Sequence, residues 1–210
     1  MAAGSVFHSK DVYNVIRRTF EIMDVKIMQH GEVTAFLLYK ILQVEGAYSE
    51  QEMVEYAMIG MMHDIGIIKT GYGGTILERE YNSVWAHSIY GYLFLRYLSP
   101  IGNKAEIVLY HHLPYRLHGK IKSPYMKVTE YLTLADKMDV YMRMEGQEID
   151  KDQFAQNVYA EFAPRAVEMF NRAQQKYNVM GMIKDGSYKE ELDNLFQNAN
   201  FSEKYKKGFL

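Results

Sequence analysis

The sequence predicts an all-α fold, and three observations support that prediction. The 210 residues include only four prolines, at positions 100, 114, 124 and 164, so long helices are permitted over most of the chain. No segment alternates apolar and polar residues as a half-buried strand would, and no internal repeat is visible. Glycines at positions 46, 66 and 102 stand where helices are expected to stop. We expect helices at about residues 9–22, 31–44, 50–64, 82–98, 103–112, 125–144, 151–177 and 187–197.

Two of these helices carry start signals. Ser49 is followed three residues later by Glu52, and Asp150 by Gln153, and both pairs resemble the capping box that opens a helix. Pro164 falls inside the helix expected at the C-terminal side, where it should kink or interrupt it. That stretch is amphipathic, which suits either covering the domain or pairing with another subunit.

The composition bounds the class of protein. Hydrophobic residues make up 48% of the chain, including 18 tyrosines and 10 phenylalanines, which is ample for a core. The net charge of −2 comes from interspersed charges of both signs, so nothing indicates nucleic acid or an acidic membrane surface as a partner. The absence of cysteine excludes disulfides, zinc–thiolate sites and thiol nucleophiles.

No targeting or membrane segment is evident. The N-terminal stretch "MAAGSVFHSKDVYNV" lacks the apolar core of a signal peptide. The longest apolar stretches, such as "SIYGYLFLRYL", fall short of the ~20 residues that span a bilayer. We therefore expect a soluble, cytoplasmic protein.

Histidines and aspartates lie against the apolar faces of five expected helices. They are His30, His63, Asp64, His87, His111, His112 and Asp136. Burying a carboxylate costs several kcal/mol unless it is paired or bound to a cation. Imidazole is the commonest metal ligand, and aspartate adds hard oxygen and negative charge. Five imidazoles and two carboxylates are enough for two metal ions, particularly if Asp64 bridges them. Each histidine taken alone is more often a satisfied core or surface residue, so spacing by itself leaves both interpretations open.

The order of these residues resembles the HD superfamily of metal-dependent phosphohydrolases, and is most similar to its HD-GYP branch. The matching stretches are "DVKIMQH", "HDIG", "WAHSIYG", "YHH" and "LADKMDVY", which together span roughly residues 10–145. The last is similar to that branch's Ala-Asp-x-x-Asp-Ala signature, with Val140 in place of the final alanine. The resemblance implies an HD-type helical bundle for residues 1–145. Residues 146–210 would then form a helical extension packed on the same domain.

The resemblance also implies a ligand set. In the family, the first histidine, the HD pair and the late aspartate hold one metal, here His30, His63, Asp64 and Asp136. The second ion takes the bridging Asp64 with His87, His111 and His112. A water or hydroxide lies between the ions, and two cations on the order of 4 Å apart make it nucleophilic and clamp phosphoryl oxygens. Mixed histidine and carboxylate ligation suits iron or manganese, while zinc also fits.

Two departures from the family pattern lie near the first histidines. Many members place a glutamate four residues before the first histidine, as a ligand to a third metal, but here that position is Lys26. A cation there cannot ligate, so we expect two ions. The lysine that usually follows HDIG is replaced by Ile67. Lys69, at the start of the irregular stretch 69–75, is a substitute phosphate contact and, with Asp64, a catalytic candidate; the alternative is an ordinary solvated lysine.

The third departure is the loop at 113–124. It reads "LPYRLHGKIKSP" and lacks the Gly-Tyr-Pro of the branch. It keeps a locally basic set, Arg116, His118 and Lys120, as candidate substrate-binding residues. A solvated charged loop is the alternative interpretation. Specificity for cyclic di-GMP therefore does not follow from the resemblance.

Three functional hypotheses result. The first is a dinuclear metal phosphohydrolase, a phosphodiesterase acting on a small-molecule phosphoester, a nucleotide or a cyclic dinucleotide. The second is a mixed-valent diiron oxygenase, which a few HD proteins are. The third is a ligand-sensing module whose altered loops have lost catalysis. A homodimer is compatible with all three.

Overall fold

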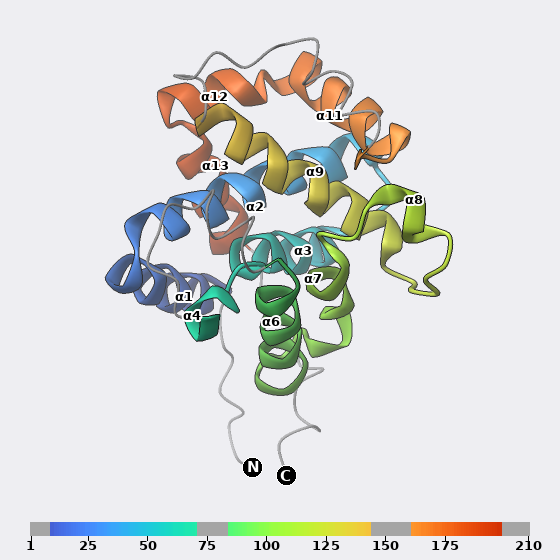
Figure 1. Ribbon diagram of the computed structural model, residues 1–210. Coiled ribbons are helices and arrows are strands. Elements are labelled where there is room, and N and C mark those ends of the chain that lie inside the picture. The colour runs from blue at the N-terminus through green and yellow to red at the C-terminus, as the bar shows by residue number, and fades with distance from the viewer. Residues whose placement is uncertain (1–8, 71–83, 144–160, 199–210) are drawn as a thin grey trace, which may run out of the picture.

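The computed structural model describes residues 9–70, 84–143 and 161–198. Every described element is a helix, which confirms the all-α prediction (Figure 1). The elements are α1 (Ser9–Met23), α2 (Val25–Glu45), α3 (Glu50–Met62), α4 (Ile67–Thr70), α6 (Val84–Leu98), η1 (Gly102–Lys104), α7 (Glu106–Tyr110), α8 (Tyr115–His118), α9 (Met126–Arg143), α11 (Pro164–Tyr177), α12 (Val179–Asp185) and α13 (Tyr188–Asn198). None of the described helices combines the length and apolarity that crossing a bilayer requires.

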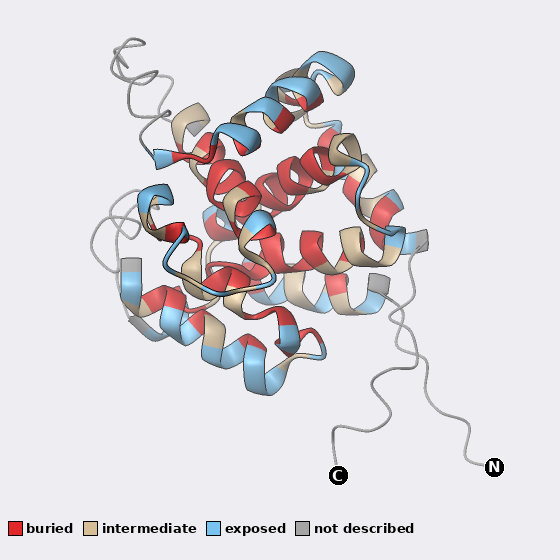
Figure 2. Ribbon diagram, turned by 90° about the vertical axis from the view of Figure 1, so that its right-hand side faces the viewer, coloured by how far each residue is buried: buried red, intermediate tan, exposed pale blue. Residues whose placement is uncertain are grey.

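Helix α2 runs through the centre of the molecule. Asp24 caps its start, because the Asp24 side chain accepts a 2.8 Å hydrogen bond from the backbone N–H of Lys26. Gly46 closes its end in the left-handed conformation, at φ 69°. Nearly every residue between positions 30 and 42 is buried, so α2 is covered on all sides (Figure 2). A helix that is apolar all round belongs in a core.

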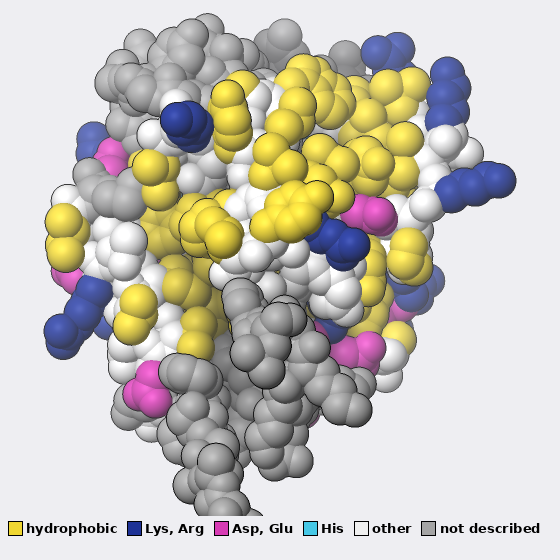
Figure 3. Space-filling model, turned by 90° about the horizontal axis from the view of Figure 1, so that it is seen from below, with side chains coloured by type: hydrophobic (Ala, Val, Ile, Leu, Met, Phe, Trp, Pro, Cys, Tyr) yellow, Lys and Arg dark blue, Asp and Glu magenta, His cyan; other side chains and the backbone are white. Residues whose placement is uncertain are grey.

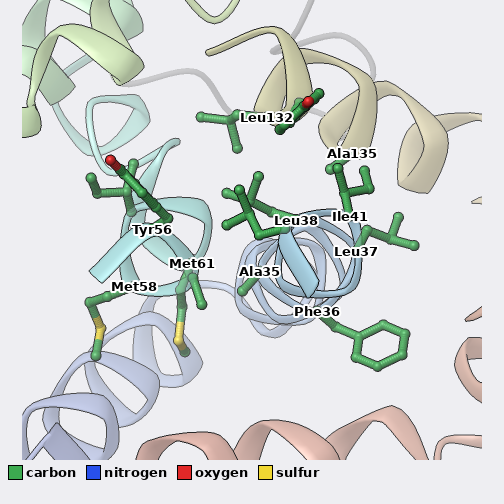
Figure 4. Close-up of a cluster of buried hydrophobic side chains, with 14 of the residues drawn as sticks. Ala35, Phe36, Leu37, Leu38, Ile41, Tyr56, Met58, Met61, Leu132 and Ala135 are labelled. Carbon is green, nitrogen blue, oxygen red and sulfur yellow. The ribbon is translucent and has the colours of Figure 1, made fainter. Parts of the chain in front are cut away.

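The packing around α2 draws on helices from both halves of the chain. α3 and α9 pack against it most extensively, and α11, α1 and α13 cover the remaining sides. Leu38 points towards Leu132 and Ile41 towards Ala135, both in α9 (Figure 4). On another side of α2, the Phe36 ring lies 5.8 Å from the ring of Tyr188 in α13. Burying each such side chain contributes about 1.5–3 kcal/mol.

The C-terminal end of α2 is tied to α9 and α11 through Glu45. Its carboxylate accepts hydrogen bonds of 2.7 Å from the Tyr131 hydroxyl and of 2.9 and 3.0 Å from Arg165, and it pairs with Lys127. The Glu45 side chain is only 2% exposed. Burial alone would raise the pKa of this carboxyl, but the hydrogen bonds from its three partners lower the pKa to about 2. This network fixes the end of the central helix.

The helices after residue 160 lie against the rest of the molecule. α11 packs on α2 and α9, α13 packs on α1 and α2, and α12 contacts α2 and α13. Pro164 occupies the first turn of α11, where its missing N–H costs nothing, so a helix begins there instead of being kinked. The start expected for this segment, at Asp150 and Gln153, lies outside the described residues.

Several expected boundaries were wrong. The helix expected at 31–44 begins at Val25, so His30 lies inside it and not before it. Gly66 does not stop a helix, because α3 ends at Met62 and Gly66 lies in the turn before α4. Gly102 opens the η1 turn, and a side chain there would lie 2.5 Å from the carbonyl oxygen of Arg96. The Ser49–Glu52 capping box is present, as expected. Sequence reasoning missed the short helices α4, α8 and α12.

Candidate metal centre

Seven side chains from separate helices converge at one place in the interior. They are His30 in α2, His63 and Asp64 at the end of α3, His87 in α6, His111 and His112 after α7, and Asp136 in α9. The side chain of each is at most 4% exposed. The structure therefore brings together all seven residues that were expected from the sequence to be metal ligands.

The first group consists of His30, His63 and Asp136. The Nε2 atoms of His30 and His63 lie 3.2 and 3.6 Å from the Asp136 Oδ1 atom. One ligand atom from each of the three residues lies within 4.8 Å of the others. Three ligand atoms from α2, α3 and α9 thus face one point.

The second group consists of Asp64, His87, His111 and His112. The Asp64 Oδ1 atom lies 3.4 Å from His87 Nε2 and 3.9 Å from His111 Nε2. The Nε2 atoms of His87 and His112 are 2.8 Å apart. The other oxygen of Asp64, Oδ2, lies 3.7 Å from His30 Nε2 in the first group. The Oδ1 atom also lies 3.6 Å from His63 Nε2 in the first group, so the Asp64 carboxylate lies between the two groups.

Most of these atoms have no hydrogen bond within the described part of the chain. They are the Nε2 atoms of His30, His63 and His111 and both carboxylate oxygens of Asp64 and Asp136. A buried polar atom without a partner costs about 1–3 kcal/mol. Two ligands on one ion, each bound at about 2.1 Å, are separated by about 3–4.2 Å. The separations of 3.2–3.9 Å between the aspartate oxygens and histidine nitrogens fall in that range, and the 2.8 Å between His87 Nε2 and His112 Nε2 is slightly shorter. The residues present fit a metal site.

The opposite ring nitrogens of three histidines are held by the protein. The Nδ1 atoms of His63 and His111 each donate a 2.6 Å hydrogen bond to a backbone carbonyl, that of Gly60 and that of Val108. The Nδ1 atom of His30 lies 2.6 Å from the Asp139 carboxylate, to which it donates. These contacts hold a proton on Nδ1 of each ring, so Nε2 is the nitrogen that faces the centre and is placed to bind a metal.

Asp139 was not assigned a role from the sequence. It is the second aspartate of the "LADKMDVY" stretch, and its side chain is 3% exposed. The signal that could have found it is its spacing, because residues three apart on a helix share a face and Asp136 already pointed inward. Asp139 orients His30 and does not itself belong to either group of facing atoms.

The charge states of His111, His112 and the two aspartates favour ligation, whereas His30 and His63 must first lose a proton. Although burial opposes their charged forms, contacts with Asp136 and Asp139 raise the pKa of His30 well above its usual value, and Asp64 and Asp136 raise the pKa of His63. Metal binding would therefore displace a proton from each of these two rings. Burial, reinforced by neighbouring positive groups, holds the pKa of His111 and His112 well below the usual value, so both rings are neutral. Burial opposes ionisation of Asp136, but the Lys137 charge and the contacts from nearby histidines keep its pKa well below the usual range. For Asp64, neighbouring histidines likewise outweigh burial and lower the pKa. Neutral imidazoles and ionised carboxylates are the forms that bind metals.

Two glycines allow the backbones to approach closely enough to build the centre. A side chain at Gly31, next to His30, would lie 2.5 Å from the Met61 carbonyl oxygen in α3. A side chain at Gly66 would lie 1.9 Å from the carbonyl oxygen of His87 in α6. Gly66 therefore lets the turn after His63 rest directly on the helix that carries His87.

The other residues singled out from the sequence lie outside these two groups. Lys69 in α4, Arg116 in α8 and Lys120 are exposed. His118 is buried, with Nε2 2.7 Å from the Leu113 carbonyl oxygen and Nδ1 3.1 Å from the carboxylate of Glu130. A substrate could reach the His118 ring only by breaking these contacts.

Lys26, which stands where many family members have a glutamate ligand, lies in the first turn of α2. It is exposed to solvent. The Lys26 ammonium group could point towards the centre or towards solvent, and in the structure it points towards solvent.

The chain was compared with known proteins. A family model described as HD domain matches residues 7–144. No curated protein and no solved structure matched the chain. The matched region contains all seven converging residues, from His30 to Asp136. The chain belongs to the HD-domain family, whose members are generally metal-dependent phosphohydrolases.

Proposed function

We propose that the protein is a dinuclear metal-dependent phosphohydrolase that cleaves a phosphoester bond of a nucleotide, including a cyclic dinucleotide. The observation that supports the proposal is the position of Asp64 between two groups of ligand atoms. Its Oδ2 atom lies 3.7 Å from His30 Nε2, and its Oδ1 atom lies 3.4 Å from His87 Nε2. A carboxylate that faces two ligand groups in this way suits a bridge between two divalent ions, iron or manganese foremost and zinc next.

The division of labour follows from the chemistry. Two bound cations supply a nucleophile at neutral pH and neutralise charge that builds on the phosphoryl oxygens. The protein's part is to orient the imidazole rings, and the Nδ1 hydrogen bonds of His30, His63 and His111 do so. Their burial also excludes bulk water, which strengthens every electrostatic interaction in the site.

We propose that the substrate contacts basic residues that follow the metal ligands closely along the chain. Lys69 lies three residues after Gly66, on the short helix α4 that packs against α6. Arg116 and Lys120 are exposed on and after α8 and offer charge-assisted hydrogen bonds to phosphate. His118 is better suited to holding this segment against α9, through Glu130, than to binding phosphate directly. We also propose that the chain belongs to the HD-GYP branch, because the stretch "LADKMDVY" is similar to the signature of that branch. The substrate class would then be a nucleotide phosphodiester.

The test is hydrolysis of a generic aryl phosphodiester by protein purified without chelators, with manganese or iron added. We expect turnover by the wild type and a loss of several orders of magnitude in His112→Ala, with the fold retained by circular dichroism. His118→Gln is the matched histidine control, and its metal content should equal that of the wild type. Absence of hydrolysis with every metal and phosphoester tried would contradict the proposal. Oxygen consumption by an iron-loaded sample would instead indicate an oxygenase.

A further inference from the structure

Helix α6 is apolar on the side that faces solvent as well as on the side that faces the core. Its inner face carries His87, Ser88, Gly91 and Leu95, which are buried. Its outer face carries large apolar side chains that are between 38% and 69% exposed, namely Trp85, Ile89, Tyr90, Leu93, Phe94, Tyr97 and Leu98. A helix that is apolar all round is normally buried all round.

The exposed side chains follow the ridge pattern of helix packing. Trp85, Ile89, Leu93 and Tyr97 are spaced four residues apart and form one ridge along α6. Tyr90, Phe94 and Leu98 form a second ridge beside it, also at a spacing of four. Two such ridges leave a groove between them, which receives a ridge of the same kind when two helices cross at about −50°.

The exposed area is large for a surface without a partner. Aromatic side chains present about 150–250 Å² each, so the partly exposed outer face of α6 amounts to several hundred Å². Seen from below, the molecule shows hydrophobic side chains gathered over this region (Figure 3). Monomeric proteins rarely leave contiguous apolar patches larger than a few hundred Å² exposed. A stable dimer buries about 800 Å² on each partner, which is the same order.

We propose that the outer face of α6 is the interface of a homodimer, in which α6 packs against α6 of a second copy around a two-fold axis. The absence of charge favours this partner. Arg96 is the single charged residue among positions 84–98, and its guanidinium lies 3.4 Å from the carbonyl oxygen of Gly102 in its own chain. Two identical faces can therefore meet without opposing like charges. A helix that lies on a membrane surface would instead be rich in lysine and arginine.

The interface would sit directly behind the metal centre. His87 projects inward from the helix whose outer face pairs, and the backbone of α6 is in contact with the turn at Gly66. The dimer would thus hold α6 between the second copy on one side and the ligand-bearing turn on the other. The metal groups would remain complete within each chain, because the described residues of one chain supply both of them.

The first test measures the mass of the full-length protein by light scattering after gel filtration. The chain mass is 24.5 kDa, and we expect the wild type to run at twice that mass. Leu93→Glu places a charge at the centre of the outer face and should weaken association at least about thirtyfold, as loss of an interface hot spot does. Ile22→Glu, at an 86% exposed position of α1, is the matched control and should remain a dimer. A monomeric wild type, or a Leu93→Glu variant whose dimer dissociation constant in a dilution series equals that of the wild type, would overturn the proposal.

A second test does not depend on a destabilising substitution. The chain has no cysteine, so each of the variants Ile89→Cys, Leu93→Cys and Tyr97→Cys carries a single thiol. Mild oxidation should link two copies through at least one of these positions, since a disulfide needs Cα atoms within about 7 Å. Ile22→Cys should stay unlinked. Failure of all three ridge positions to cross-link would overturn the proposal, as would binding of the wild type to lipid vesicles as a monomer.

Discussion

The two ends of α2 bury charged side chains in opposite ways. At the end that carries His30, carboxylate oxygens and imidazole nitrogens face one another, and most have no hydrogen bond within the described residues. At the other end, 15 residues later, Glu45 is equally buried but accepts hydrogen bonds from α9 and α11 through both oxygens. At Glu45, protein groups donate hydrogen bonds to both carboxylate oxygens. At the His30 end, most of the facing oxygen and nitrogen atoms have no such partner in the described residues. The difference separates a stabilising network from a binding site.

The energetic meaning of the two clusters follows from desolvation. A buried carboxylate costs several kcal/mol, which hydrogen bonds from cationic groups offset. Around Glu45 the protein supplies that compensation itself. Around Asp64 and Asp136 nearby charges lower the carboxyl pKa values, but no described group donates a hydrogen bond to the carboxylate oxygens, so a cation is needed to complete the site. Substitutions at the two ends should therefore separate metal binding from stability.

The largest effect is expected for Asp64→Ala. This change removes the oxygens that face both ligand groups, so we expect the loss of all bound metal and a fall in turnover of at least about 10³-fold. Elemental analysis and phosphodiesterase assays measure the two effects. Asp185→Ala, at the exposed last residue of α12, is the control and should keep both. Stoichiometric metal in Asp64→Ala would show that Asp64 does not join the two groups.

A smaller effect on the same end is expected for Asp139. Asp139→Ala leaves the His30 Nδ1 proton without its acceptor and frees the ring to turn, so metal affinity should fall about 10–100-fold. Asp139→Asn keeps an oxygen acceptor without the charge and should lie between the wild type and the alanine variant. Competition with a chromophoric chelator measures the affinity without relying on activity. Equal affinities for all three proteins would leave Asp139 without a positioning role.

At the other end of α2, Glu45→Gln should reduce the free energy of unfolding by about 2 kcal/mol and leave the metal content unchanged. A buried pair loses about 3–5 kcal/mol when one partner is removed. Here Lys127 and Arg165 are about half exposed, which reduces the effect. Glu168→Gln is the control, since its pair with Arg172 is 3.8 Å long and largely exposed. Denaturant unfolding measures the difference.

The contribution of Glu45 to the free energy of unfolding should depend on pH. The pKa of Glu45 is lowered from 4.5 to about 2, so its contribution is fully present above pH 4.5 and is lost as the pH falls towards 2. The difference in unfolding free energy between wild type and Glu45→Gln should therefore shrink across that interval. A difference that stays constant from pH 5 to pH 2 would contradict the assignment of the low pKa to Glu45.

The sequence predicts the helices better than their ends. Apolar periodicity and scarce prolines indicate a helix wherever one face must be buried, and α1, α3, α6 and α9 follow the expectation closely. Gly66 and Gly102 were misinterpreted because a glycine that permits a close backbone approach looks the same in sequence as one that ends a helix. The start of α2 was missed because the cap at Asp24 lacks the second half of a capping box.

Some features of the candidate site and its surroundings could likewise be predicted from the sequence, and others could not. The seven converging residues could be listed from their order along the chain, because the resemblance supplied the pattern. The Glu45 network could not, since it joins residues 82 to 120 positions apart and depends on how α9 and α11 dock. The solvent exposure of the outer face of α6 was equally invisible, because the stretch "SIYGYLFLRYL" has the same composition whether one side of the helix or both sides are covered.

The burial of the ligand atoms has a consequence for the rate at which metal is exchanged. The side chains that face the centre come from five different helices and are at most 4% exposed. Because packed helices hold these side chains, they cannot swing away from a bound ion one at a time, and dissociation should take longer than from a site on a surface loop. The metal found in the purified protein would then record which ion was abundant when the chain folded. Later changes in the surrounding metal concentrations would leave little trace.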